Sequence, residues 1–303
     1  MRVIAVFNHK GGVGKTTTVA NLAAAIARDG ARVLLIDADP QACLSVHFGY
    51  DLGDTGTSLY EVLTKDRPLT EAVRETGEEN LRLVPSHLDL AGAEMELTST
   101  IGRERLLRQA LDAYLAEHET DYVFIDCPPS LGLLTVNSLC ASREIFVPIQ
   151  TEYFALRGIG RLVDVVRLIQ RRMNPDLRIT GILPTLHRAG TLLAREVKDE
   201  IEKHFAGTVF KTVIRTNVRL AEAPSHGKSI FAYAPSSPGA ADYLALAEEV
   251  RAMPGVQVPS GSIDSIGSTD SIGSTGPMSV DEIASAAEID SPDETNRAAP
   301  EVA

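Results

Sequence analysis

Continuous apolar runs separated by helix-length amphipathic segments dominate the first 250 residues. The apolar runs, of which the last three are weaker, lie at 3–7, 33–36, 122–125, 145–147, 81–84, 179–183 and 209–214. Runs without polar alternation are typical of parallel strands that are covered on both faces. Helical patterns lie between them, at 16–28, 103–117, 131–140, 156–173, 191–205 and 239–252. This alternation predicts an α/β fold with a doubly wound, mainly parallel sheet and helices on both faces.

The pattern ends after Pro254, where Ser, Gly, Asp and Pro become dominant. The hexapeptide Asp-Ser-Ile-Gly-Ser-Thr occurs twice in tandem, at 264–269 and 270–275. Such a composition provides few side chains for a core. We therefore expect one domain over 1–255 and a disordered, low-complexity tail over 256–303, within which 279–289 could form a short acidic helix.

The charge of the chain is concentrated in that tail. It contains nine acidic residues and one basic residue, so it carries −8 of the total net charge of −12 and leaves −4 for residues 1–255. A body so close to neutral can present a local basic face, because attraction depends on local potential. The acidic composition therefore does not exclude DNA as a partner.

Several absences in the sequence indicate a cytoplasmic protein. No apolar window is long enough to span a membrane, and the first ten residues lack the features of a signal peptide. The three cysteines have no paired spacing, so we expect them to be small buried apolar residues. The seven histidines show no metal-ligand spacing.

A glycine-rich segment follows the first apolar run and precedes a helical pattern. It reads Gly11-Gly12-Val13-Gly14-Lys15-Thr16-Thr17. The standard phosphate-loop spacing would place Gly at position 9, where this chain has His9, but Gly14-Lys15-Thr16 is intact. The dinucleotide fingerprint fails because Thr17 stands where its third Gly belongs. The context favours a nucleotide-binding loop over a plain turn, with Lys15 on the β- and γ-phosphates and Thr16 on Mg²⁺.

A second lysine, Lys10, precedes this loop. Cradling phosphates within one subunit does not require it. It could be a solvated loop charge, or it could contact the phosphates of a second subunit in the manner of an arginine finger. The spacing alone leaves both possibilities open.

Three aspartates follow two of the apolar runs. Asp37 and Asp39 end the run at 33–36, and Asp126 ends the run at 122–125. Ligands of open α/β sheets bind at the carboxyl ends of the strands, where these side chains should lie. Asp126 fits a carboxylate that binds Mg²⁺ directly or through water. The alternative is that strand-end aspartates cap the helices that follow them.

These motifs resemble the ParA/MinD family of ATPases, and most closely the ParA/Soj-type partition ATPases. Residues 10–17, KGGVGKTT, match the deviant Walker-A loop of that family. Further motifs follow in the family's order at 37–41, 126–130, 152–156 and 217–225. The resemblance covers residues 2 to about 252. It implies ATP and Mg²⁺ as cofactors and a homodimer when ATP is bound, with weak intrinsic ATPase activity that DNA and a partner stimulate.

The resemblance also implies roles for individual residues. Lys10 would reach across the ATP-bound dimer, Asp39 would position the attacking water, and Asp37 would lie near the Mg²⁺ shell. Asn217 belongs to a segment that lies near the adenine in the family. Relatives often carry Pro-Arg-Asn there, whereas this chain has Arg215-Thr216-Asn217. That departure leaves base recognition open.

ParA-type dimers bind double-stranded DNA without sequence preference, and the resemblance extends this expectation to the present chain. Candidate phosphate contacts are Arg188, Arg195, Lys198, Lys203, Arg215, Arg219 and Lys228, of which the last two lie in the best-matched segment. Acidic residues are interleaved along 195–203, so a solvated mixed-charge face is equally consistent there. MinD-type relatives end in a basic membrane-binding helix; the acidic tail here predicts no membrane binding.

The function we expect is an ATP-driven dimerisation switch on the nucleoid. A ParB-like partner would trigger hydrolysis, and the cycle would segregate a chromosome or plasmid. The alternative is the same switch positioning another cargo, such as a protein cluster or an organelle. A scaffold without turnover is a third possibility, against which Lys10 and Asp39 argue. The loop begins by residue 10, so we expect no preceding sequence-reading DNA module.

Overall fold

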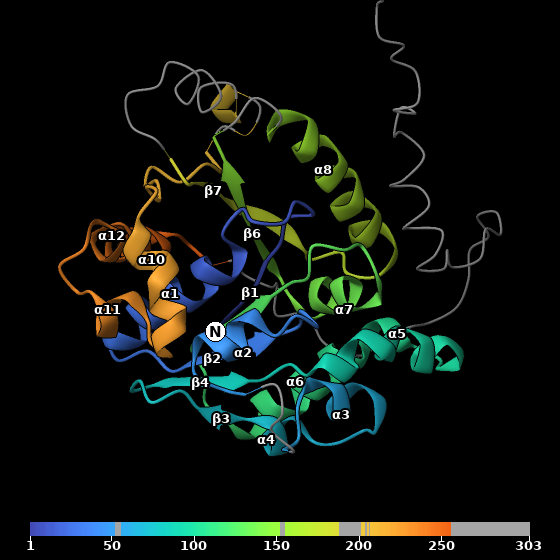
Figure 1. Cartoon of the computed structure of the whole chain (residues 1–303). Coiled ribbons are helices and arrows are strands. Elements are labelled where there is room, and N and C mark those ends of the chain that lie inside the picture. The colour runs from blue at the N-terminus through green and yellow to red at the C-terminus, as the bar shows by residue number, and fades with distance from the viewer. Residues whose placement is uncertain (52–55, 152–154, 188–200, 204, 206, 256–303) are drawn as a thin grey trace, which may run out of the picture.

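The computed structural model describes residues 1–51, 56–151, 155–187, 201–203, 205 and 207–255. The predicted tail and most of the predicted helix at 191–205 lie outside these residues. Within them a seven-stranded sheet has the order β3-β4-β2-β5-β1-β6-β7 (Figure 1). The parallel strands are β1 (Arg2–Val6), β2 (Val33–Asp37), β4 (Leu81–Val84), β5 (Tyr122–Asp126), β6 (Glu144–Gln150) and β7 (Arg178–Thr185). Only β3 (Arg74–Glu75) is antiparallel to its described neighbour.

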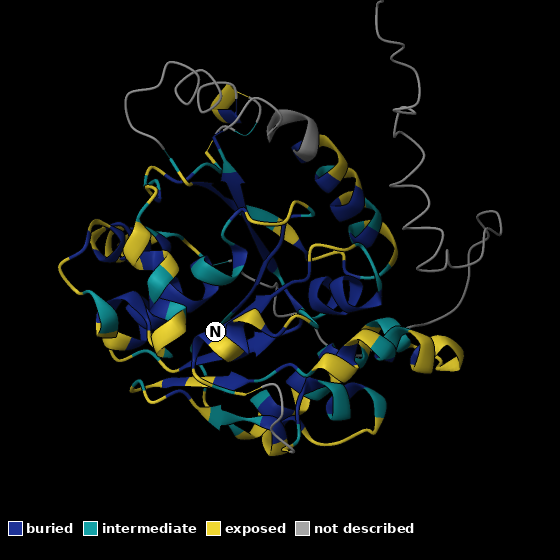
Figure 2. Ribbon diagram, viewed as in Figure 1, coloured by how far each residue is buried: buried dark blue, intermediate teal, exposed yellow. Residues whose placement is uncertain are grey.

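Alternate side chains of each central strand enter two separate cores. In β1, Val3 and Ala5 pack on one face, and Ile4 and Val6 pack on the other. The first face is covered by α3 (Leu59–Thr64), α4 (Leu69–Ala72), α5 (Ala93–Glu96), α6 (Leu106–Glu117), α7 (Leu133–Ala141) and α8 (Ala155–Arg172). Helices α1 (Lys15–Arg28) and α12 (Pro238–Ala252) cover the second face. The buried strands between them (Figure 2) confirm the predicted doubly wound α/β fold.

Short helices connect these elements, and the hydrophobic pattern predicts none of them except the first turn of the helical pattern at 103–117, which is 3₁₀ at Arg103–Arg105. They are α2 (Cys43–His47), α10 (Val218–Glu222), α11 (Ile230–Tyr233) and the 3₁₀ turns at Leu88–Gly92, Leu97–Ser99, Arg103–Arg105 and Ala223–His226. Each spans three to five residues, which is too short for the repeat of an amphipathic helix to appear.

The predicted strand at 209–214 is wrong, since among the described residues this segment forms a single isolated bridge to β7, from Val209 to Ile182. The amide of Phe210 donates to the carbonyl of Ile182, and that of Ile214 donates to the carbonyl of Pro184, each at 2.9 Å. Between them, the amides of Lys211 and Thr212 donate instead to the carboxylate of Glu249 on α12, at 2.7 and 3.0 Å. The side chain of Glu249 therefore replaces the ladder at the centre of the segment.

A buried ion pair joins the amino end of the sheet to α12. The guanidinium of Arg2 donates to both carboxylate oxygens of Glu144, at 2.8 and 2.6 Å, and to the carbonyl of Val250 at 2.6 Å. The hydroxyl of Thr180 also donates to Glu144. Strands β1, β6 and β7 are thus connected through one carboxylate.

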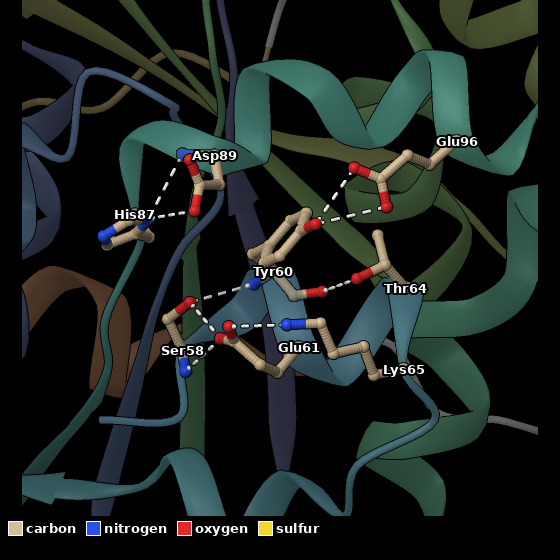
Figure 3. Close-up of polar contacts among 8 residues, drawn as sticks. All are labelled: Ser58, Tyr60, Glu61, Thr64, Lys65, His87, Asp89 and Glu96. Atoms are coloured by element: carbon tan, nitrogen blue, oxygen red, sulfur yellow. Dashed lines mark hydrogen bonds and ion pairs between the residues drawn. The ribbon is translucent and has the colours of Figure 1, made fainter. Parts of the chain in front are cut away.

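Polar contacts hold the segment after β4 against α3 (Figure 3). Ser58 caps α3 and forms a capping box with Glu61. The hydroxyl of Tyr60 donates to both carboxylate oxygens of Glu96, at 2.9 and 3.2 Å. The bonds of Tyr60 connect α3 to α5.

Candidate functional site: a phosphate loop with paired aspartates

The loop between β1 and α1 depends on two glycines. Gly12 has a φ of 71° and Gly14 a φ of 87°, values that residues with a side chain rarely adopt. A Cβ at either position would meet no atom within 4 Å, so the requirement is one of backbone conformation and not of space. Helix α1 begins immediately after Gly14, and its first amides have no partner within the helix. They face the loop, where they can bind phosphate oxygens.

Neighbouring strand ends hold this loop in place. The hydroxyl of Thr185, at the end of β7, donates to the carbonyl of Val13 at 2.8 Å. The side-chain amide of Asn8 donates to the carbonyl of Pro148 at 2.8 Å, and its oxygen accepts from the amide of Lys10 at 3.0 Å. The loop is therefore fixed to β6 and β7 on one side of β1.

The two lysines of the loop differ in environment. Lys15 is only 7% exposed, and its Nζ donates to the carbonyl of Lys10 at 3.2 Å. Burial lowers the pKa of Lys15, and the nearby carboxylate of Asp126 opposes that shift. Lys10 is exposed, and its Nζ donates to Oε1 of Gln150 at 2.8 Å. Lys15 thus lies inside the loop, whereas Lys10 lies at its rim.

Asp37 and Asp126 are register partners at the carboxyl ends of β2 and β5. The hydroxyl of Thr16 donates to Oδ2 of Asp126 at 2.6 Å. The other oxygen, Oδ1, is buried and has no hydrogen-bond partner among the described residues. A buried carboxylate oxygen without a partner calls for a ligand, and Mg²⁺ prefers oxygen donors. Thr16 and Asp126 therefore fit the predicted Mg²⁺ site.

Burial controls the protonation of both aspartates. It raises the pKa of Asp126 well above its ordinary value, and the charge of Asp37 adds to the effect. Burial also raises the pKa of Asp37 to about 7, although hydrogen bonds from Ser45 and Asp39 oppose the shift. A cation bound between these groups would favour their ionised forms.

Asp37 ends β2 and Asp39 follows it by two residues, but their side chains have different environments. Asp37 is completely buried, and its Oδ1 accepts from the amide of Asp39 at 3.2 Å. Asp39 is half-buried, and its own carboxylate accepts from the amide of Gln41 at 2.9 Å. Asp39 is thus the more accessible carboxylate of the two.

A cavity of about 120 Å³ adjoins the phosphate loop. Gly14 and Thr17 line it from the loop side, while Ile214, Asn217 and Tyr243 line it from the later part of the chain. Asn217 also caps α10 by accepting from the amide of Arg219. The predicted nucleotide residues at 14, 17 and 217 therefore meet at one cavity beside the loop, which is where a base would follow the phosphates.

Two of the predicted DNA contacts that the structure describes are already paired with carboxylates. Arg215 is paired with Asp242 at 2.6 Å, and Arg219 with Glu222 at 2.7 Å. Lys228 is exposed, and the described residues include no ion-pair partner for it. Lys203 is also exposed. Arg188, Arg195 and Lys198 lie outside the described residues.

Sequence reasoning missed several residues that support this site, namely Ser45, Gln150, Thr185, Asp242 and Tyr243. Gln150 and Thr185 end apolar strands, a position that could have identified them. Ser45 and Asp242 act through contacts 8 and 27 residues away in sequence, so spacing provided no signal. Among the cysteines, Cys127 and Cys140 are buried as expected, but Cys43 is exposed. It stands on the solvent side of α2, whose buried side presents Leu44, Ser45 and His47.

The sheet order, the glycine loop and the paired carboxylates define a P-loop nucleotide-binding protein. A family model described as an AAA domain matches residues 1–179. The sporulation initiation inhibitor protein Soj of Bacillus subtilis is 49% identical over 251 residues, covering 83% of this chain and 98% of Soj. The chromosome partitioning protein ParA of Myxococcus xanthus is 43% identical, covering 82% of this chain and 87% of ParA. The chain belongs to the Soj/ParA family.

A solved structure has the same fold. Cobyrinic acid a,c-diamide synthase of Mycobacterium smegmatis, with a bound ATP analogue and magnesium, superposes with a TM-score of 0.72 at 38% identity. The match covers 83% of this chain and 94% of that one. Across the described ranges, no helix combines the length and apolar character that crossing a membrane requires.

Proposed function

We propose that this chain is an ATP-dependent dimerisation switch that drives chromosome or plasmid segregation. In this proposal the ATP-bound homodimer binds DNA without sequence preference, and a ParB-like partner stimulates hydrolysis. The observation that carries the proposal is the meeting of Lys15, Thr16 and the unpartnered oxygen of Asp126 beside a cavity of about 120 Å³, with Lys10 at the rim. The name of the ParA relatives, chromosome partitioning protein, supports the role in segregation.

Nucleotide binding follows from the loop. The backbone amides after Gly14 would donate to phosphate oxygens, and Nζ of Lys15 would exchange the carbonyl of Lys10 for the β- and γ-phosphates. Thr16 and Asp126 would hold Mg²⁺, with Asp37 beside them; the bound cation neutralises charge on the phosphates. The base would occupy the cavity that Thr17 and Asn217 line.

Hydrolysis requires a group that orients water and a charge that stabilises the transferred phosphoryl group. Asp39 is the accessible carboxylate near the loop, which supports its proposed role with the water. Lys10 would leave Gln150 and approach the phosphates of the second subunit. Turnover in this scheme depends on dimerisation, because one subunit lacks a charge that its partner supplies.

DNA binding would use exposed basic side chains after β7. Lys228 is the better placed of the candidates in 207–255, since Arg215 and Arg219 already have carboxylate partners. Non-specific binding needs several phosphate contacts and weakens steeply with salt. A dimer doubles the number of such contacts, which makes DNA binding depend on ATP.

The test is to measure ATPase activity and DNA retention together for the wild type and for Asp39→Ala. We expect wild-type turnover to rise with DNA and a ParB-like peptide. We expect Asp39→Ala to dimerise with ATP and stay on DNA, but to lose turnover by about 100-fold or more. Asp89→Ala, which removes an exposed aspartate, is the matched control. Equal DNA binding by the ATP and ADP forms at all salt concentrations would overturn the proposal.

A further inference from the structure

Ser45 gives two hydrogen bonds to one oxygen of Asp37. Its amide donates to Oδ2 at 2.8 Å, and its hydroxyl donates to the same atom at 2.7 Å. Ser45 is the third residue of α2 and is only 2% exposed. These bonds, together with the amide of Asp39 on Oδ1, fix the orientation of a carboxylate that is itself completely buried.

The direction of the hydroxyl bond follows from a neighbour. The amide of Ser86, just after β4, donates to Oγ of Ser45 at 2.9 Å. An amide can only donate, so it occupies an acceptor site of the hydroxyl oxygen and leaves the hydroxyl proton for Asp37. Oδ2 of Asp37 therefore acts as the acceptor, and Ser45 connects the end of β4 to the end of β2.

Each of the two buried carboxylates accepts a hydrogen bond from a hydroxyl group. Asp126 accepts from the hydroxyl of Thr16 and Asp37 accepts from the hydroxyl of Ser45, while the strands place the two aspartates in register. Like charges so placed repel each other, and fixed donors with a cation between them offset the repulsion. A loosened Asp37 could turn away from Asp126, which would weaken the binding of any cation shared by the pair.

We propose that Ser45 is a positioning residue that holds Asp37 beside Asp126 and thereby sets the Mg²⁺ affinity of the nucleotide site. The inference rests on the proposed function, because it takes the two aspartates as part of an ATP and Mg²⁺ site. Asp37 could instead merely cap α2, for which the amide bond alone would suffice. Only the positioning role requires the hydroxyl of Ser45, so its removal distinguishes positioning from capping.

The experiment measures binding of a non-hydrolysable ATP analogue, by fluorescence, as the Mg²⁺ concentration is varied. We expect Ser45→Ala to raise the Mg²⁺ midpoint roughly tenfold or more, as for loss of a hydrogen bond to a charged group. Nucleotide affinity without Mg²⁺ should stay unchanged. Ser86→Ala is the matched control, because it removes a neighbouring hydroxyl that has no partner and keeps the amide that Ser45 needs.

Ser45→Thr and Ser45→Val provide a pair of equal size in case Ser45→Ala does not fold. Only threonine keeps the hydroxyl, so its Mg²⁺ midpoint should stay close to wild type while that of valine rises. A purely structural role would lower the melting temperature of these variants without separating their Mg²⁺ midpoints. Equal midpoints for Thr and Val would overturn the inference.

The proposed function fails in a different way. If the wild type binds no nucleotide with or without Mg²⁺, both the function and the inference are wrong. If the wild type binds the analogue in a Mg²⁺-dependent way and all Ser45 variants match it, only the role of Ser45 is wrong.

Discussion

The Nζ of Lys10 donates a hydrogen bond of 2.8 Å to Oε1 of Gln150, across the mouth of the phosphate loop. Gln150 is the last residue of β6, and its side-chain Nε2 donates to the carbonyl of Gly12 at 3.5 Å. Lys10 is therefore turned toward its own subunit. If it serves the phosphates of a second subunit, this exposed bond has to break first.

Replacing Lys10 should separate nucleotide binding from dimerisation. We expect Lys10→Ala to bind ATP with near wild-type affinity, because Lys15 remains, but to stay monomeric in light-scattering measurements with ATP. Gln150→Ala is the matched control: it removes the bond to Lys10 and should still dimerise. An ATP-induced dimer of Lys10→Ala would show that this lysine does not bridge subunits.

Replacing Lys15 should strongly weaken nucleotide binding itself. The buried ammonium is the charge inside the loop, and loss of its hydrogen bonds to phosphate should weaken ATP affinity by about 100-fold. A titration with fluorescent ATP measures this for Lys15→Ala. Lys65→Ala, in an exposed pair on α3, should bind like the wild type. Near wild-type affinity of Lys15→Ala would refute the phosphate-loop assignment.

The pairing of Arg219 with Glu222 predicts opposite effects of two substitutions on DNA binding. Glu222→Gln removes the negative partner of Arg219, so DNA binding should tighten at low salt. Lys228→Ala removes an exposed phosphate contact, so binding should weaken and the salt slope should fall by about 2 in a dimer. Salt titrations with ATP present measure both. A loss of ATP affinity in either variant would mean that the site was disturbed instead.

His47 should make the folded state sensitive to acid. Burial lowers the pKa of His47 to about 4, although a backbone hydrogen bond with Lys228 acts in the opposite direction. In the described part of the chain, Nε2 of His47 has no hydrogen-bond partner. Between about pH 6.5 and 4 the unfolded chain binds a proton that the folded chain does not. The stabilisation is complete above that range, and about 3 kcal/mol is lost as the pH falls through it.

Urea unfolding at several pH values measures this dependence. His47→Gln should show a shallower loss of unfolding free energy below pH 6.5 than the wild type. The raised pKa of Asp37 makes the unfolding free energy change with pH in the opposite direction. Asp37 is present in both proteins, so its effect cancels in the comparison. Parallel pH curves for the two proteins would mean that His47 is not neutral in the folded state.

The ion pair of Arg2 and Glu144 should contribute to stability but not to nucleotide binding. Glu144→Gln leaves the buried Arg2 without its counterion, and breaking a buried pair in this way costs about 3 kcal/mol. Glu144 is the first residue of β6, so it lies at the amino ends of the strands, whereas the phosphate loop follows the carboxyl end of β1. ATP affinity should therefore not change. Glu119→Gln, in an exposed pair with Arg32, should have little effect. Urea unfolding distinguishes the two.

The sequence predicted the sheet because most positions of its parallel strands are apolar and buried. Lys10, Lys15, Asp37 and Asp126 could be placed because a loop and two strand ends define positions along the chain. The role of Ser45 could not, since it depends on how α2 packs against β2 and β4. The strand at 209–214 was wrong for a similar reason: Glu249, far away in sequence, takes its central amides.

The arrangement at 209–214 has a consequence for self-association. Exposed sheet edges are templates onto which other chains can add strands, and aggregation often begins there. Here residues 209–214 lie along the outer side of β7, and the amides of Phe210 and Ile214, near the two ends of this segment, donate to carbonyls of β7. At the other edge of the sheet, β3 is only two residues long. Neither edge of the described sheet presents a long row of open amides and carbonyls. Uncontrolled addition of strands from other chains is therefore disfavoured at both edges of the described sheet.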